Sequence, residues 1–429
     1  MTICASNGRN CIRNLHNIPT TFVPQKDQMK NFTLMQWIVI IILSLLTALE
    51  PLCIDMYLPG FIQMSKAFST PISAVQISLS TFLGGFAIGQ LIWGPLADRF
   101  GRKKPILVSL FIFILASIAC LYVKTIEQLW VVRFIQAIGG CGGVVISRAI
   151  VTDYFDKNNT LKIFALLALI MGVAPIVAPA IGNFVLRSFN WIGLFHAMVI
   201  LGVVLFLLTL VALPETFHKV TKKNNVNVWQ GYWQILKVRK FQVYSLLAGL
   251  ANGALMIYVA NGPFLIMEYG GFSGDIFSLI IGINALGLMI GSYFTTIWQK
   301  YISTNRLVKY ALLFMGIVSV ILFATMYMNA GIIPILIVLF FYVFPIGILF
   351  PTTTELAITP FIHNSGTASA LFGSIQLMVA FICSLISNYM TDGSIITVGL
   401  SFLLCCVVSF IAIFIPMKKT EYIREAIKE

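Results

Sequence analysis

Twelve apolar stretches, each long enough to cross a lipid bilayer as a helix, constrain the fold of this 429-residue chain more than any other feature. A spanning helix needs about 20 mostly apolar residues, whereas barrel strands alternate over about ten. Only 10% of the residues are charged, too few to cover a water-soluble core. The sequence therefore predicts an all-α, multi-pass membrane protein. The stretches cover residues 34–58, 75–97, 105–123, 127–152, 160–186, 190–213, 240–265, 276–298, 307–327, 331–353, 366–388 and 394–415.

The Lys and Arg residues lie almost entirely on one side of the predicted membrane. If the N-terminus is inside, the cytoplasmic segments hold 23 of the 28, and the opposite loops hold Lys66, Lys124 and Arg187. The other two, Arg133 and Arg148, fall within a span. Cytoplasmic loops of membrane proteins carry such an excess of basic residues. We therefore expect both termini in the cytoplasm, and the net charge of +13 requires no nucleic-acid partner.

A polar segment divides the spans into two sets of six, which predicts two six-helix bundles with tails on either side. Within the linker, Trp229, Tyr232 and Trp233 follow helical spacing, which predicts a short amphipathic helix on the inner leaflet. We expect the N-terminal tail to be disordered. The predicted regions are the tail 1–33, the first bundle 34–213, the linker 214–240, the second bundle 241–416 and the tail 417–429.

The loop between the second and third spans has the sequence GPLADRFGRKK over Gly94–Lys104, with one acid and four bases. Glycine at position 94 permits close helix approach, and Gly101 allows a tight turn. A plain basic hairpin would explain the charge of this loop, but not the order of its residues.

The charged residues of this loop predict a latch between the two halves on the cytoplasmic side. Asp98 can face the N-terminus of the eleventh span, where free backbone N–H groups favour an anion. Arg99 or Arg102 can pair with Asp153 at the end of the fourth span. Such a latch would stabilise the outward-open state.

Two carboxylates, Glu50 and Asp55, lie within the first span, where charges are costly and mark functional sites. Five residues of helix place them about 140° apart, although a kink at Pro51 can change this. Arg133 of the fourth span lies at a depth similar to that of Asp55. An Asp55–Arg133 pair, direct or through Gln136, is therefore geometrically allowed.

A carboxylate at such a place can couple transport to protons. Burial favours its protonated form, and a nearby arginine favours its charged form. Opening the site to one side and then to the other changes both effects, so one acid can load a proton outside and release it inside. Two simpler roles stay open: Asp55 as a helix-end charge at the outer interface, and Glu50 as a hydrogen-bonded structural group.

The fifth span contains two prolines and two glycines at helical spacing: Gly172, Pro175, Pro179 and Gly182. Prolines kink a helix, and small residues let a neighbouring helix pack closely. The sequence therefore predicts a kinked helix in close contact with another.

Together these segments resemble the Bcr/CflA branch of the major facilitator superfamily over residues 34–416. That resemblance implies drug:proton antiport, and it adds Tyr57 to Asp55, Glu50, Arg133 and Gln136 as expected coupling and substrate residues. Ala137 and Asn183 depart from the pattern, which has Gly at both places. The matching segments are 54–59, 94–104, 133–136, 174–182, 213–216, 261–264 and 366–369.

The favoured function is a proton-coupled exporter of small amphipathic compounds in the inner membrane, acting by alternating access. Its cargo would be a drug such as a bicyclomycin- or chloramphenicol-like molecule, or a secreted metabolite such as a siderophore. The alternative is a facilitator or proton symporter importing a small nutrient. Polar nutrients usually need several charged groups facing the cavity, and the spans of the second half have almost none, Glu355 lying near a helix end.

An enzyme is not expected, because no nucleotide-binding loop, paired histidine cluster or Ser-His-Asp order occurs. No cofactor or metal is expected either, since Cys4, Cys11 and His16 have no evident fourth ligand. The expected partners are a small-molecule substrate, protons and the lipid bilayer, and the chain is expected to act as a monomer.

Overall fold

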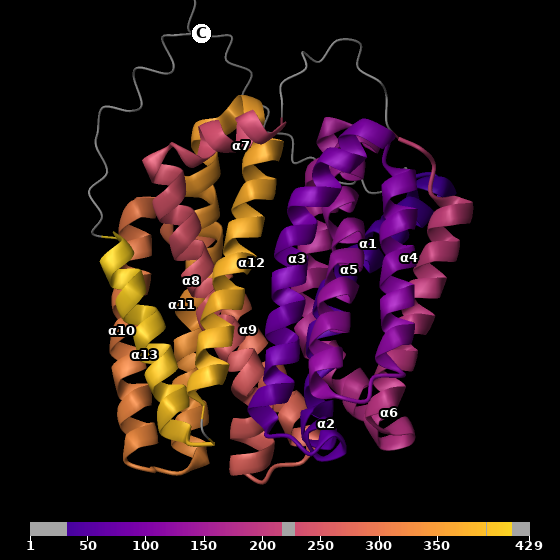
Figure 1. The fold of residues 1–429 in the computed structure, drawn as a ribbon. Coiled ribbons are helices and arrows are strands. Elements are labelled where there is room, and N and C mark those ends of the chain that lie inside the picture. The colour runs from indigo at the N-terminus through magenta and orange to yellow at the C-terminus, as the bar shows by residue number, and fades with distance from the viewer. Residues whose placement is uncertain (1–31, 217–227, 392, 414–429) are drawn as a thin grey trace, which may run out of the picture. The chain divides into compact units, whose positions relative to one another are not determined.

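The computed structural model describes residues 32–216, 228–391 and 393–413. All regular elements within these ranges are helices (Figure 1). The helices of the first half are α1 (Leu34–Asp55), η2 (Leu58–Gly60), α2 (Phe61–Phe68), α3 (Ile72–Phe100), α4 (Lys103–Cys120), α5 (Ile126–Tyr154) and α6 (Lys157–Ala212). The remaining helices are α7 (Val228–Leu236), α8 (Arg239–Gly262), η3 (Pro263–Tyr269), α9 (Gly274–Trp298), α10 (Thr304–Tyr327), α11 (Ile332–Ile358), η4 (Thr359–Asn364), α12 (Ser365–Met390) and α13 (Ile395–Ile413).

The chain from Val39 onward forms one compact unit, and α1 begins in a separate short unit that ends at Ile38. The predicted disordered tail, apart from its last two residues, and the C-terminal tail lie outside the described residues.

Eleven helices are long and apolar enough to cross a membrane within the described residues, and one of them, α6, contains two spans. Its 56 residues are interrupted at Asn190, which has φ 57° and ψ −171°. The Asn190 side chain accepts a hydrogen bond from the Ile192 amide at 2.9 Å, as an N-cap does, which favours the break at this residue. The break separates the spans predicted at 160–186 and 190–213, so the twelve-helix prediction is confirmed.

Glycines let the helices of each half approach closely. A Cβ atom on Gly139 of α5 would collide with the Phe113 backbone of α4, and one on Gly347 of α11 would collide with the Leu288 carbonyl of α9. Membrane helices associate through such small residues, because lipid gives them no hydrophobic drive to pack.

The two halves meet along α3 with α12 and along α6 with α9. In Figure 1, α3 and α12 run side by side through the centre. The Ser80 and Ser384 hydroxyls are 2.8 Å apart, and Ser374 donates to the Ala87 carbonyl at 2.9 Å. Gln76 donates to Asn261 at 3.3 Å. These bonds leave α3 bound to the second half along much of its length.

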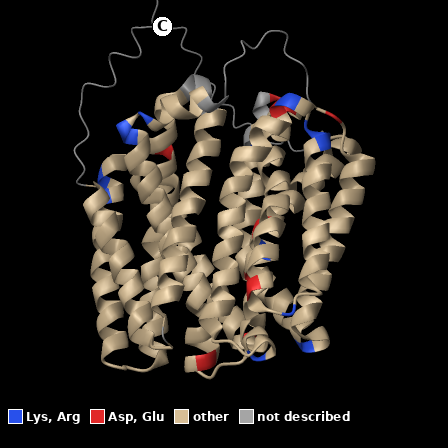
Figure 2. Ribbon diagram, viewed as in Figure 1, with Lys and Arg blue, Asp and Glu red and all other residues tan. Residues whose placement is uncertain are grey.

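We call the end of the bundle that bears the loop Gly101–Lys104 the loop end, and the end that bears α2 the far end. Figure 2 shows Lys and Arg residues gathered at the loop end, close to α7. The α7 helix buries Tyr232 and Ile235 and leaves Trp233 63% exposed, so it has an apolar face toward the bundle. That the loop end faces the cytoplasm stays a prediction.

Candidate functional site

Asp55 is the last residue of α1, just before the chain turns into η2. It is buried, with only 5% of its surface exposed. No hydrogen bond or ion pair joins its carboxylate to another residue in the described part of the chain. Buried carboxylates are nearly always paired, so a buried one without a partner points to a role in function.

The turn after Asp55 packs closely against α6. A Cβ atom on Gly182 would collide with the carbonyl oxygen of Met56, the residue that follows Asp55. Glycine at the end of the predicted fifth-span motif therefore determines how near α6 comes to the end of α1. The two prolines of that motif, Pro175 and Pro179, lie inside the continuous helical part of α6.

Replacing Gly182 by alanine should displace the Met56 turn and the neighbouring Asp55, and should lower the export rate about tenfold or more. Gly172 of the same motif is the matched control, because its nearest neighbours are atoms of Met289 at 3.7 Å, an ordinary contact. Export is measured as energised uptake into inverted vesicles. Equal rates in the two alanine variants would refute a positioning role for Gly182.

Arg133 of α5 is fully buried, with its guanidinium between the rings of Tyr57 and Phe82 at 4.4 Å and 4.3 Å from their centroids. It donates to the Cys53 carbonyl at 3.0 Å and to the Gln136 side-chain oxygen at 2.6 Å. Aromatic faces and carbonyl oxygens stabilise a buried cation. Arg133 thus binds the last turn of α1, two residues before Asp55.

The Asp55–Arg133 pair allowed by the sequence is absent. No described carboxylate lies within ion-pair distance of Arg133, and the Gln136 amide donates to Ser117 at 2.7 Å instead of bridging to Asp55. The physical reason is that the guanidinium points at the C-terminal carbonyls of α1, where the helix dipole is negative. Arg133, Gln136 and Tyr57 form one cluster, and Asp55 lies outside it.

Glu50 is half-buried, five residues before Asp55 in α1. No hydrogen bond or ion pair joins it to another described residue, although the charge of the exposed Arg148 acts on it. Each of the two carboxylates of α1 is therefore left without a hydrogen-bond or ion-pair partner among the described residues, while the charge of Glu50 acts on Asp55.

At the loop end, Arg102 is the centre of a polar network. It donates to Asp153 at 2.7 Å and to Asp98 at 2.8 Å, while its backbone N–H donates to Glu215 at 2.8 Å. Burial alone would lower the pKa of Arg102, but the hydrogen bonds to Asp153 and Asp98 outweigh it and raise that pKa. Gly101 has φ 91°, a region that favours glycine.

Sequence reasoning missed the role of Glu215. Its carboxylate accepts from the backbone N–H groups of Arg102 and Lys103, at the start of α4. A carboxylate at a helix N-terminus stabilises the unpaired N–H groups there. The signal was an acid directly after the last span of the first half, but nothing in the sequence pairs it with a loop more than 100 residues earlier.

The bonds of Arg102 and Glu215 that the structure gives lie within the first half and the segment directly after it, so the latch between the halves stays a prediction. Asp98 binds Arg102 and none of the described residues of α12, and Arg99 lies 5.3 Å from the Phe100 ring rather than at Asp153. A Cβ atom on Gly94 would meet nothing within 4 Å, so no described helix approaches closely there. Among the described residues, neither Asp98 nor Gly94 contacts the second half through a hydrogen bond, an ion pair or a close Cβ approach.

The far end does carry a bond between the halves. Asp275, in the first turn of α9, accepts from Asn183 of α6 at 2.6 Å and forms an ion pair with Arg187. Asn183 is one of the departures from the family pattern, and glycine there would lose this bond. The hydrogen bonds that described residues make between the halves thus extend from the far end to the middle of the bundle.

Replacing Asp275 by alanine should favour separation of the far end. The ion pair is exposed, so we expect only about a twofold to fivefold change in the populations of the two states. Spin labels on Ser188 and Ile276 would report the distance between α6 and α9. Glu127→Gln, an exposed acid in the first turn of α5, is the control. An unchanged distance distribution in Asp275→Ala would contradict this assignment.

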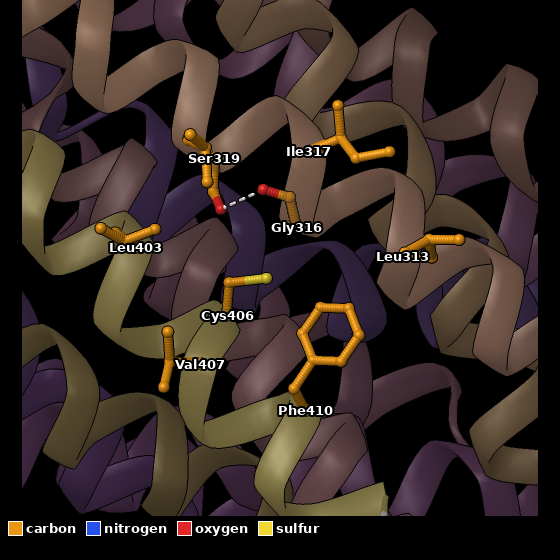
Figure 3. A pocket seen from close by; sticks show the side chains of 9 residues that line it. Leu313, Gly316, Ile317, Ser319, Leu403, Cys406, Val407 and Phe410 are labelled. Carbon is orange, nitrogen blue, oxygen red and sulfur yellow. Dashed lines mark hydrogen bonds between the residues drawn. The ribbon is translucent and has the colours of Figure 1, made fainter.

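A separate groove of about 310 Å³ lies between α10 and α13 (Figure 3). Its lining is apolar except for Ser319, which donates to the Gly316 carbonyl at 2.8 Å. None of the predicted site residues lines it. No group of three or more His, Cys, Asp or Glu side chains that could hold a metal occurs within the described ranges, and Cys4, Cys11 and His16 lie outside them.

Comparisons with known proteins identify the family of the chain. The model of the Major Facilitator Superfamily matches residues 43–384. An uncharacterised MFS-type transporter of Bacillus subtilis, YdgK, is 35% identical over 80% of this chain and 86% of its own length. A bicyclomycin resistance protein homolog of Haemophilus influenzae is 27% identical over 88% of this chain and 96% of its own length. The multidrug transporter MdfA of Yersinia pestis is 30% identical over 76% of this chain and 80% of its own length.

Solved structures show the same fold. The D-xylose–proton symporter aligns with a TM-score of 0.72 at 15% identity, covering 89% of this chain and 98% of its own. A bacterial homolog of the human lysosomal transporter Spinster, in an inward-facing conformation, aligns with a TM-score of 0.67 at 15% identity, covering 89% of this chain and 96% of its own. At such identities the likeness extends to the fold alone. The chain is a multi-pass membrane transporter and not an enzyme, and it belongs to the major facilitator superfamily.

Proposed function

We propose that this transporter exports small amphipathic compounds across the inner membrane in exchange for protons, acting as a single chain. The proposal depends on the state of Asp55 at the end of α1. The residue is only 5% exposed, and no described residue forms a hydrogen bond or ion pair with its carboxylate. Relatives named as multidrug transporters and as a bicyclomycin resistance protein homolog support the export of drug-like molecules.

The coupling follows from alternating burial and exposure of one carboxyl group. Burial favours the neutral form, and contact with water or with a cationic cargo favours the charged form. A proton and a cargo molecule that compete for Asp55 cannot both occupy it, so each turn of the cycle exchanges one for the other. Arg133 keeps the last turn of α1 in place while its own charge is directed at Cys53.

The state of the structure fits one step of this cycle. The halves are bonded from the far end to the middle of the bundle, through Asp275 and through the α3–α12 contacts. With the loop end assigned to the cytoplasm, as the charge distribution predicts, this is an inward-facing arrangement with the outer side closed. The latch residues Asp98 and Arg102 would join the halves in the opposite, outward-facing state.

The alternative is import of a small nutrient, by a facilitator or a proton symporter. The D-xylose–proton symporter shares the fold but only 15% of the sequence, so it does not favour this function. In the second half, Glu355 binds Gln299 at 2.7 Å and also Thr304 at the exposed end of α11, away from the middle of the bundle. This leaves few groups there to bind a strongly polar nutrient.

Transport by inverted vesicles tests the function. The vesicles are acidified inside, so that protons are driven outward, and a pH-sensitive dye follows the gradient. A panel of lipophilic cations, chloramphenicol and sugars is then added in turn. Export predicts that amphipathic compounds dissipate the gradient and accumulate, and that an uncoupler stops both. Uptake of a sugar into intact cells down its own gradient, unaffected by an uncoupler, would instead favour the facilitator.

A further inference from the structure

A buried polar pair in the second half is not explained by the fold. Tyr258 of α8 and Asn284 of α9 are each 2% exposed, and the Asn284 side-chain amide donates to the Tyr258 hydroxyl at 2.7 Å. Sequence reasoning missed both, because a single tyrosine and a single asparagine in apolar spans form no motif.

The pair has hydrogen-bonding capacity left over. The side-chain oxygen of Asn284 is buried without a partner in the described part of the chain. The Tyr258 hydroxyl accepts from Asn284, and its own proton has no described acceptor. Buried polar atoms are nearly always paired, so an unpaired acceptor beside a free donor indicates a place for a ligand.

The pair also lies on the side of the second half that approaches Asp55. The η2 helix, which begins three residues after Asp55, packs against both α8 and α9. The negative charge of Asp55 acts on Tyr258, so the two groups are within electrostatic range. Asp55 comes from the first half and the pair from the second, as expected of a site at the interface of two rocking bundles.

We propose that Tyr258 and Asn284 form the second-half side of the cargo site, opposite Asp55, and select cargo that carries an amino group. This rests on the proposed export function. The Asp55 carboxylate and the Asn284 oxygen both accept hydrogen bonds, while the Tyr258 hydroxyl donates one. A cargo N–H group can therefore satisfy an acceptor from each half, whereas a cation covered only by aryl or alkyl groups leaves the Asn284 oxygen unpaired.

Two lipophilic cations separate this selection from general binding. Ethidium carries two amino groups, and tetraphenylphosphonium carries a fixed charge without any N–H or O–H. In energised inverted vesicles, Asn284→Leu and Tyr258→Phe should each raise the half-saturating concentration of ethidium about tenfold. The half-saturating concentration of tetraphenylphosphonium should change less than about twofold in either variant. The matched control is Tyr342→Phe, at a fully buried tyrosine of α11 in the same half. It should leave the half-saturating concentrations of both cations unchanged.

The outcomes are distinguishable. If the wild-type chain moves both cations but the variants lose both equally, or lose neither, the inference is wrong and the export function stands. If the wild-type chain moves neither cation against its gradient, the export of lipophilic cations is itself wrong, and the inference falls with it. Size-exclusion profiles in detergent show whether each variant folds, and Tyr258→Phe removes only one oxygen atom, so it tests the site even where Asn284→Leu fails to fold.

Discussion

Replacing Asp55 by asparagine is expected to abolish proton-driven export while leaving the fold intact. Asparagine has almost the same shape, and no hydrogen bond or ion pair of Asp55 with a described residue would be lost. It cannot bind and release a proton, so export against a gradient should fall at least about a hundredfold, with passive exchange of cargo retained. Both are measured in inverted vesicles, with and without a pH gradient.

The matched control is Asp156→Asn, an exposed aspartate just before α6 whose side chain makes no cap hydrogen bond. It should export like the wild-type chain. Glu50→Gln tests the second carboxylate of α1: export retained there and lost in Asp55→Asn would assign the coupling to Asp55 alone. Acid-driven export that survives both substitutions would remove the coupling from α1.

Replacing Arg133 by leucine is expected to destabilise the first half strongly. The Cys53 carbonyl and the Gln136 side-chain oxygen would each lose a donor within a buried cluster. An unpaired buried polar group costs about 1–3 kcal/mol, so the free energy of unfolding should fall by about 3 kcal/mol or more. Thermal unfolding in detergent, followed with a thiol-reactive dye, measures the change.

Arg148→Leu is the control for this substitution, because Arg148 lies on the same helix but is exposed. Its effect on stability should stay within about 0.5 kcal/mol. If Arg133→Leu were as stable as Arg148→Leu yet inactive, Arg133 would act in transport directly rather than by holding the end of α1.

The spans could be predicted from the sequence because the bilayer imposes a single rule on every one of them. The twelve apolar stretches lie in eleven long helices of the described residues, because two of them fall in α6 on either side of the break at Asn190, which was not foreseen. The Arg102–Asp153 contact was one of two options in the sequence, and the structure brings this pair together. Opposite charges at helix ends that the predicted topology places on the same side of the membrane suffice to suggest such a pair.

The direction in which a side chain points could not be predicted in the same way. Counting residues along the helices predicts that Arg133 and Asp55 lie at similar depths in the membrane. It does not predict that the rings of Tyr57 and Phe82 hold the Arg133 guanidinium toward the Cys53 carbonyl. The latch stays a prediction for another reason: its contacts between the halves would belong to the outward-open state, and a structure shows one state at a time. Sequence patterns do not say which state a structure adopts.

Asn284 and Glu215 show a third limit. Each acts through a partner on another element, and neither lies in a pattern that names that partner. The side chain of Asn284 is buried with an unpaired oxygen, and Glu215 binds a distant loop. Both properties can be seen only once the helices are packed.

Proton release on cargo binding tests the central claim most directly. Purified protein in a weakly buffered detergent solution is mixed with an exported cation, and the pH change is compared with the amount bound. If Asp55 exchanges a proton for cargo, binding releases up to about one proton per molecule in the wild-type chain and none in Asp55→Asn. Equal proton release from both proteins, or binding without release in the wild-type chain at every pH tested, would contradict the account.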